Sequence, residues 1–381
     1  MTICQTFSNP LVKIFSGTAD REFLPFLSPK YTCSKVWLIQ VPLKVPIILY
    51  SGKISSRYYI VRPEEVISWD ERLSKLHGLT YDQLLQLISP NEVAVEFAAR
   101  YSLISNSMKC KRCGQMMLLW SRNGLDGLQW RCMHVVTKQE RRSGRKRNYC
   151  SSLSIRHGSI FHGHHLSIAD IIEFMYLWAQ NYKLHEIRLH THFSSEMSVA
   201  WADYMRQIAS GFVEANQTPI GGPGTVVEIG RLILYKTRIG EQHPYLIGMV
   251  ERETENCIII AIEDYTTERL KQKVLQWILR DTILISDEGT YIDGLNQLDY
   301  PIFITETYVE RFELVNGQKL SVNNVLLQNI CNEAKAKFLA MNGTCRAHFE
   351  GYIREFLFRR TFRNGDEFAG IILWAPLLHV P

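Results

Sequence analysis

The sequence predicts a multidomain protein of the α+β or α/β class, and three observations carry this prediction. A cysteine pair, Cys110-Lys111-Arg112-Cys113, stands in the most basic part of the chain. Apolar residues at helical spacing follow over residues 166–212. Beyond the glycine-rich stretch 221–224, apolar runs that open at Cys257 and Ile283 are typical of buried strands. We therefore expect a cysteine module, a helical region and a mixed sheet core, in this order.

The bulk composition fits a globular protein of two or three domains. The chain has 381 residues, of which 46% are hydrophobic and 21% are charged. The longest apolar run near the N-terminus, residues 36–50, is broken by two prolines, a lysine and a glutamine. It is too short and too interrupted to span a bilayer. We expect neither a membrane nor a small-molecule substrate as a partner.

The positive charge of the chain is concentrated in one segment. Residues 109–165 hold 12 lysines and arginines against two acids, whereas the rest of the chain is mildly acidic. Such a basic module indicates binding to a polyanion such as DNA, although a solvated charged loop is the alternative. A lysine-arginine cluster within it is also typical of a nuclear localisation signal, so we expect a nuclear protein. The expected DNA-phosphate contacts are Arg141, Arg142, Arg145, Lys146, Arg147 and Arg156.

The cysteines of this segment have the spacing of a metal site. Cys110 and Cys113 are followed by Cys132 after eighteen residues. Thiolates favour zinc, which a structural site encloses in a tetrahedron. The fourth ligand is Cys150 or His134, and we favour Cys150 because a strand-like stretch follows it directly. Free cysteines without a metal are the alternative.

The order of predicted elements divides the chain into five regions. The third expected helix of residues 166–216 begins at Ser194 or Ser195, after a tight turn, which matches a helix-turn-helix, although a three-helix connector would look the same. Beyond it, three strands (226–235, 245–252, 257–263), a helix, two further strands (282–286, 301–305) and a helix over 323–339 predict an RNase H-like mixed sheet. The regions are 1–78 of unknown role, 79–108 helical, 109–160 a zinc ribbon with a basic insert, 166–216 helix-turn-helix-like, and 225–370 RNase H-like.

A set of motifs in a fixed order extends this interpretation to a family. From about residue 80 to 368 the chain resembles the transposases of the Merlin superfamily and their bacterial insertion-sequence relatives. The motifs that carry the resemblance are Cys110-x2-Cys113-Gly114, Trp130-Arg131-Cys132, residues 154–161, Val227-Glu228-Ile229, residues 248–252, residues 263–266, residues 285–291, and Phe349-x2-Tyr352-x2-Glu355-Phe356-x2-Arg359-Arg360.

The resemblance implies a catalytic triad that this chain has mostly lost. Transposases of this kind hold two divalent metals, Mg²⁺ or Mn²⁺, with an Asp-Asp-Glu triad, because hard cations need anionic oxygens. The three family positions fall on Gly230, Asp287 and Gln328, so two of the acids are replaced. Glu228 lies two residues before Gly230, on the same face of the strand, and is the possible substitute.

These observations predict a transposase-derived DNA-binding protein with a structural zinc ion and without strand cleavage. The partners considered for it are DNA and further copies of the same chain in a homo-oligomer. Two alternatives remain at this stage. One is an active transposase with a rearranged metal site, which would need Mg²⁺ or Mn²⁺. The other is a protein-interaction scaffold derived from a transposase.

Overall fold

The computed structural model describes residues 58–134, 150–234, 245–262, 265–305, 310–313, 319–341, 346–363 and 365–379. The chain divides into two compact units, Met1–Gly52 and Lys53–Pro381, and all described residues belong to the second. The expectations for the first 57 residues and for the basic insert 135–149 thus lie outside the described residues. In the described part, no helix combines the length and apolar content that a membrane span requires.

Three short helices open the described chain: α1 (Trp69–Leu76), α2 (Tyr81–Ile88) and α3 (Asn91–Arg100), after the 3-10 turn η2 (Pro63–Glu65). The start of α2 is a capping box, in which the hydroxyl of Thr80 accepts from the Gln83 amide and the Gln83 side chain accepts from the Thr80 amide. Pro90 is the N-cap of α3, and both α2 and α3 lie within the predicted helical region 79–108.

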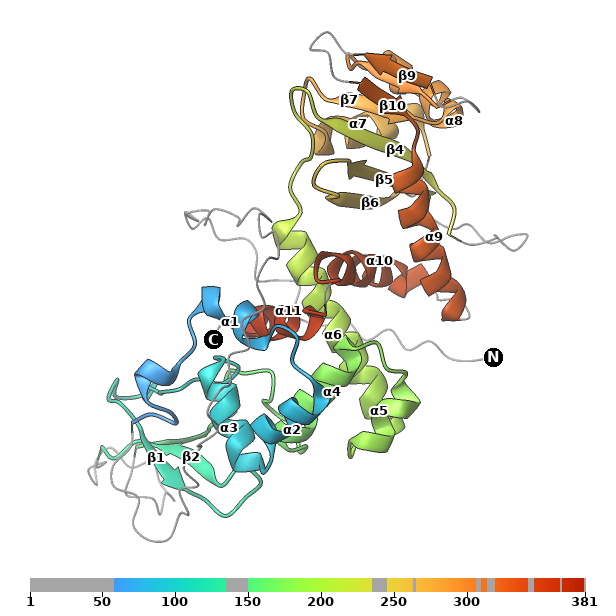
Figure 1. Ribbon diagram of the computed structural model, residues 1–381. Helices are drawn as coiled ribbons and strands as arrows, with labels where there is room; N and C mark the ends of the chain where they lie inside the picture. Colours follow the sequence, from blue (N-terminus) through green and yellow to red (C-terminus); the bar gives the residue numbers. More distant parts are fainter. Residues whose placement is uncertain are drawn as a thin grey trace. The chain divides into compact units, whose positions relative to one another are not determined.

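The cysteine module forms a small antiparallel sheet of three strands, β1 (Leu118–Ser121), β2 (Leu128–Arg131) and β3 (Ser152–Ser154), in this spatial order (Figure 1). Leu119 pairs with Trp130, and both side chains are buried. Side chains alternate along a strand, so the neighbours of these two residues lie on the opposite face of the sheet.

Helices α4 (Ile168–Ala179), α5 (Leu184–His190) and α6 (Ser195–Asn216) follow, close to the predicted positions. Ser167 and Ser194 cap α4 and α6, because each hydroxyl accepts a hydrogen bond from the backbone amide three residues later. Helix α6 ends at Asn216, beyond the apolar periodicity of residues 166–212. Phe212 and Val213 remain on its buried stripe, so tertiary packing carries the helix past Gly211.

The second half of the chain contains a mixed sheet with the strand order β6-β5-β4-β7-β8. Strands β4 (Val226–Leu232), β5 (Tyr245–Glu251) and β6 (Cys257–Ile262) are antiparallel, whereas β7 (Ile283–Ser286) and β8 (Ile302–Ile304) run parallel to β4. Helix α7 (Thr267–Trp277) packs on one face through Leu270 and Val274, and α9 (Val325–Ala340) packs on the other face through Leu327 and Ile330 (Figure 1). The predicted mixed sheet flanked by helices is confirmed at this level.

Several elements near the sheet and at the C-terminal end were not predicted. They are α8 (Glu288–Ile292), η3 (Leu295–Gln297), the hairpin of β9 (Glu310–Glu313) and β10 (Lys319–Val322), α10 (Arg346–Thr361), α11 (Glu367–Trp374) and η4 (Ala375–His379). Helix α11 packs against α1, α4 and α6, and its Phe368 ring meets Tyr176 of α4 edge-on. The predicted boundary at residue 370 therefore falls inside a helix that packs with the helical region rather than with the sheet.

A buried charge cluster joins α9, α10 and the end of α4. Glu355 of α10 accepts from Lys337 of α9 at 2.7 Å and from Arg359 at 2.9 Å. Arg359 also donates to the last carbonyls of α4, at Trp178 and Ala179, and lies over the Trp178 ring. These bonds satisfy helix-end acceptors that would otherwise lack partners. They connect the sheet-flanking helix to the helical region.

Candidate metal centre and the carboxylate edge of the sheet

The four predicted zinc ligands converge in the structure. The sulfur atoms of Cys110, Cys113, Cys132 and Cys150 all lie within 4.8 Å of one another. Cys110 and Cys150 are 3.7 Å apart, and Cys113 and Cys132 are 3.4 Å apart. Zinc–sulfur bonds of about 2.3 Å in a tetrahedron place the sulfurs about 3.8 Å apart, so the arrangement fits a zinc ion.

Backbone hydrogen bonds position the cysteines in two turns. In the first, Gly114 adopts a φ of +72°, which favours glycine, and its amide donates to the Cys110 carbonyl. In the second, the Cys132 amide donates to Ser151, and the Cys150 amide donates to His134. His134 thus supplies a carbonyl to the turn, while Cys150 supplies the fourth sulfur.

The electrostatics of the cluster also favour a bound cation. Burial disfavours the thiolate, yet hydrogen bonds from Ser151 and from backbone amides lower the pKa of Cys110 to about 6. Burial raises the pKa of Cys132 to about 12 and also raises that of Cys150. Four thiolates this close repel one another, so all four ionise together only around a metal. The cluster can hold a structural metal such as zinc.

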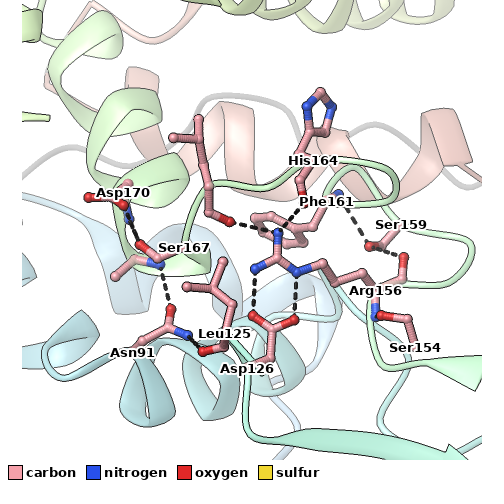
Figure 2. A network of polar contacts seen from close by, with 12 residues as sticks. Asn91, Leu125, Asp126, Ser154, Arg156, Ser159, Phe161, His164, Ser167 and Asp170 are labelled. Atoms are coloured by element: carbon pink, nitrogen blue, oxygen red, sulfur yellow. Dashed lines mark hydrogen bonds and ion pairs between the residues drawn. The ribbon is translucent and has the colours of Figure 1, made fainter. Parts of the chain in front are cut away.

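Arg156, which the sequence assigned to DNA phosphate, has a different role. Its side chain is 6% exposed and donates to both carboxylate oxygens of Asp126, at 2.6 and 2.5 Å. It also donates to the carbonyls of His164 and Leu166, directly before α4 (Figure 2). The structure does not support a phosphate contact for this residue, because the guanidinium is buried and these bonds engage it. Arg156 instead fixes the cysteine module to the helical region.

Asn91 reinforces the same junction from α3. Its side chain donates to the Leu125 carbonyl in the β1–β2 turn and accepts from the Ala169 amide in the first turn of α4 (Figure 2). The other five predicted phosphate contacts, between Arg141 and Arg147, lie outside the described residues.

The charge of the helical region does not favour contact with phosphate. Residues 166–216 contain three lysines and arginines against six acids. The single arginine of α6, Arg206, lies over the Tyr352 ring and pairs with Asp203. The exposed residues at the start of α6 include Glu196 and no cation. Positive charge is therefore available in the cysteine module and not on the helix that a helix-turn-helix would use for reading DNA.

Gly230, on which the resemblance places the first acid, lies directly beside Asp287. Strands β4 and β7 are parallel neighbours, and Ile229 pairs with Ser286, so the next residues, Gly230 within β4 and Asp287 just after β7, lie side by side. A Cβ atom at Gly230 would lie 2.8 Å from Asp287 Oδ2 and 3.2 Å from Leu327 Cδ2. The room for a first carboxylate is thus filled by the Asp287 side chain and by an apolar side chain.

A second glycine explains why Leu327 can occupy this place. Gly230 of β4 pairs with Gly248 of β5, and a Cβ atom at Gly248 would lie 2.8 Å from Leu327 Cδ1. The paired glycines leave a hollow in the sheet face, and Leu327 of α9 fills it. The packing of Leu327 depends on the absence of a side chain at Gly230 and at Gly248.

Asp287 itself caps a helix. One carboxylate oxygen accepts from the Thr290 amide at 2.8 Å, and the other accepts from the Thr290 hydroxyl at 3.1 Å. This is the geometry of an N-cap side chain at the start of α8. An aspartate at the start of a helical stretch is a sequence signal for an N-cap. From the sequence we assigned Asp287 to metal binding instead and did not consider the N-cap role.

Glu228 does not turn toward Asp287. Its side chain is 1% exposed; one oxygen accepts from Arg252 Nε at 2.7 Å and the other from the Leu327 amide at 2.9 Å. Arg252 also donates to the Ser321 carbonyl at 2.7 Å and to the Asn323 carbonyl. Both carboxylate oxygens are engaged in this buried pair, which does not support Glu228 as a substitute for the first acid. No local pattern in the sequence pointed to Arg252 as its partner.

Gln328, at the third family position, lies exposed in the first turn of α9. Its side-chain amide donates to Asn324 Oδ1 at 2.6 Å. Glu333, further along the same helix, pairs with Arg360. Within the described ranges, the cysteine cluster is the one group of three or more histidines, cysteines or acids that is close enough to hold a metal.

A comparison with known protein families finds a match for the part of the chain that contains the mixed sheet. Residues 208–361 match the family model of the ISXO2-like transposase domain. The matched transposase-like domain runs from the second half of α6 to the end of α10, so it includes the whole mixed sheet and the Asp287 edge. The match supports descent from a transposase family.

A curated relative supports the same descent at greater distance. The chain is 22% identical, over 337 residues, to the protein named "Male abnormal protein mab-31" of Caenorhabditis elegans. The alignment covers 80% of this chain and 70% of that protein. The likeness therefore extends well beyond the transposase-like domain.

Proposed function

We propose that this protein is a transposase-derived DNA-binding protein that holds a structural zinc ion and does not cut or join DNA strands. The cysteine cluster would hold the zinc, and the basic residues of the same module would contact DNA. The mixed sheet would be an RNase H-like core of the Merlin type that has become a packing scaffold. A nuclear location follows from DNA as the partner.

One observation carries the proposal that catalysis is lost. The family's first acid falls on Gly230, and the space for its side chain is taken by Asp287 and Leu327. A lone carboxylate that caps a helix cannot hold two hard cations, because each Mg²⁺ or Mn²⁺ needs several anionic or neutral oxygen ligands. The Glu228–Arg252 pair supports this assignment, since it removes the nearest acid on the same strand face.

The experiment that tests the loss restores the acids. A Gly230→Asp and Gln328→Glu variant would be compared with the unmodified protein for DNA cleavage that depends on Mg²⁺ or Mn²⁺. We expect no cleavage by the unmodified protein. Gly230→Ala is the matched control, because it adds the Cβ atom that must displace Asp287 and Leu327 but adds no charge. Cleavage by the unmodified protein, abolished by Asp287→Asn, would contradict the proposal.

The DNA-binding part is tested by its salt dependence. A protein that neutralises several phosphates loses about 10³–10⁵ in affinity between about 50 and 200 mM salt when six to ten contacts are made. We expect a steep decrease for the full chain and a much weaker one for a variant with the five cations of residues 141–147 replaced by glutamine. A full chain without salt-sensitive DNA binding would favour a protein-interaction scaffold.

A further inference from the structure

The outer face of the three-stranded sheet in the cysteine module carries an exposed aromatic ring beside a cation. Leu119 and Trp130 point to the core, so Trp120 and Arg131 lie on the opposite face. Trp120 is 42% exposed, and the Arg131 guanidinium lies 4.6 Å from its ring centroid. A tryptophan ring offers a large, rigid apolar surface on which another ring can stack.

The segment that carries Trp120 has an excess of positive charge. Residues 109–134 contain five lysines and arginines against one acid, Asp126. Asp126 is already neutralised by the bidentate bonds from Arg156, so it does not offset these five charges. The excess charge of the segment attracts phosphate, and the Trp120 ring adds an apolar surface on which a base can stack.

We propose that this face binds unpaired bases of single-stranded DNA, which stack on Trp120 while the surrounding cations attract their phosphates. The inference rests on the proposed DNA-binding function and names its substrate more narrowly. A duplex keeps its base faces stacked inside, so it offers phosphates but nothing for an aromatic ring on a sheet. An unpaired strand offers both, and stacking of one base on an aromatic side chain contributes about 1–3 kcal/mol.

A second tryptophan is exposed and lies beside an arginine but stands in an acidic segment, which does not favour binding of a nucleic acid strand. Trp69 of α1 is 40% exposed and has Arg72 at 5.5 Å from its ring centroid. It is followed by Asp70 and Glu71, which would repel a phosphate chain, and its ring packs edge-on against Trp374. The two sites share ring, exposure and cation but differ in the local field, so Trp69 is the matched control.

The test measures binding of the full zinc-loaded chain to labelled strands by fluorescence anisotropy. The probes are oligo(dT) of about 12 nucleotides, within usual site sizes, the corresponding ribonucleotide strand, and a hairpin duplex with the same number of phosphates. We expect the deoxyribonucleotide strand to bind more tightly than the duplex. Tighter binding of the ribonucleotide strand would overturn the assignment to DNA.

The variants separate stacking from charge. Trp120→Ala is expected to weaken oligo(dT) binding about 5- to 150-fold, the range that stacking of one base implies, and to leave duplex binding unchanged. Trp120→Phe should retain most of the affinity, and Trp69→Ala should bind as the unmodified protein does. An equal loss on both strands and duplex, or no loss on oligo(dT), would overturn the inference.

A measurement on the unmodified chain tests the inference without requiring that the variants fold. Oligo(dT) that carries photoreactive 4-thiothymidine is cross-linked to the protein, and the linked peptide is identified by mass spectrometry. We expect a peptide that contains Trp120, and exclusive linkage elsewhere would overturn the inference. Salt-sensitive duplex binding without a single-strand preference would defeat this inference alone, whereas no salt-sensitive binding to any probe would defeat the proposed function.

Discussion

The cysteine cluster and the edge of the mixed sheet at Asp287 are the two places where the sequence predicted that metal ligands from distant segments would meet. At the cluster all four sulfurs lie within 4.8 Å of one another. At the sheet edge Asp287 meets a glycine and a leucine. The first has kept the geometry of a metal site, whereas the second has the geometry of ordinary packing and helix capping.

The difference shows how a folded chain uses a side chain that has no metal partner. A buried carboxylate is costly unless it is hydrogen-bonded or paired with a cation. Both acids near the sheet edge meet this need from the protein itself: Glu228 pairs with Arg252, and Asp287 accepts from Thr290. Within the described ranges, the sulfur atoms of the four cysteines contact one another and the Ser151 hydroxyl, so a metal is the natural partner for them.

Removal of the metal should have the largest effect on stability, and this effect should be confined to the cysteine module. Apparent zinc-binding free energies in zinc-finger peptides are about 10–16 kcal/mol, so chelation or Cys150→Ser should release zinc and expose the cysteine module to protease. Metal analysis and limited proteolysis measure both effects. His134→Ala should keep the zinc, and loss of zinc from this variant but not from Cys150→Ser would reverse the assignment of the fourth ligand.

Loss of the Glu228 carboxylate should have the next largest effect. Breaking a buried ion pair leaves the partner unpaired and typically costs about 3–5 kcal/mol. Glu228→Ala should lower the free energy of unfolding in urea by this amount. Glu214→Ala is the control, because Glu214 forms an exposed pair with Arg354, and such pairs contribute about 0–1 kcal/mol. A cost for Glu228 as small as that of Glu214 would show that the pair does not stabilise the sheet.

Asp287 should show the smaller cost of a helix cap. Asp287→Ala is expected to lower stability by about 0.5–2 kcal/mol, whereas Asp287→Asn should be nearly neutral because asparagine caps as well as aspartate does. Thermal melting with and without Mn²⁺ separates this role from metal binding. Stabilisation of the unmodified protein by Mn²⁺ that disappears in Asp287→Asn would identify a working metal ligand.

The smallest effect on stability should come from the pair of His192 and Asp170 in the helical region. A hydrogen bond to Asp170 at 3.0 Å, together with its negative charge, raises the pKa of His192 above its ordinary value of 6.5. The folded-state pKa is the higher one, so the stabilisation is fully present below about pH 6.5 and is lost as the pH rises through the folded value. An NMR titration should show a pKa decrease on Asp170→Asn. An unchanged value would show that the pair does not form.

The predictable part of the fold was the part that depends on local pattern. The periodicity of 166–212 and the predicted cap at Ser194 or Ser195 indicated α4, α5 and α6, because a helix start is decided by a few neighbouring residues. The same approach missed α11 and the hairpin of β9 and β10. Helix α11 is fixed by packing against α1, α4 and α6, which lie far away in sequence.

For the candidate sites, too, the sequence predicted what depends on local pattern and did not predict what depends on tertiary contacts. The spacing of Cys110, Cys113 and Cys132 indicated a metal, and the glycine at position 230 was evident, because identity and spacing are written in the chain. The roles of Arg156, Glu228 and Asp287 were not, because each depends on atoms that strand pairing and helix docking bring close. Sequence by itself determined which chemical groups are present and which are absent. Only the tertiary structure decided their partners, since a charge removed from water is stabilised by whatever lies within hydrogen-bonding distance of it.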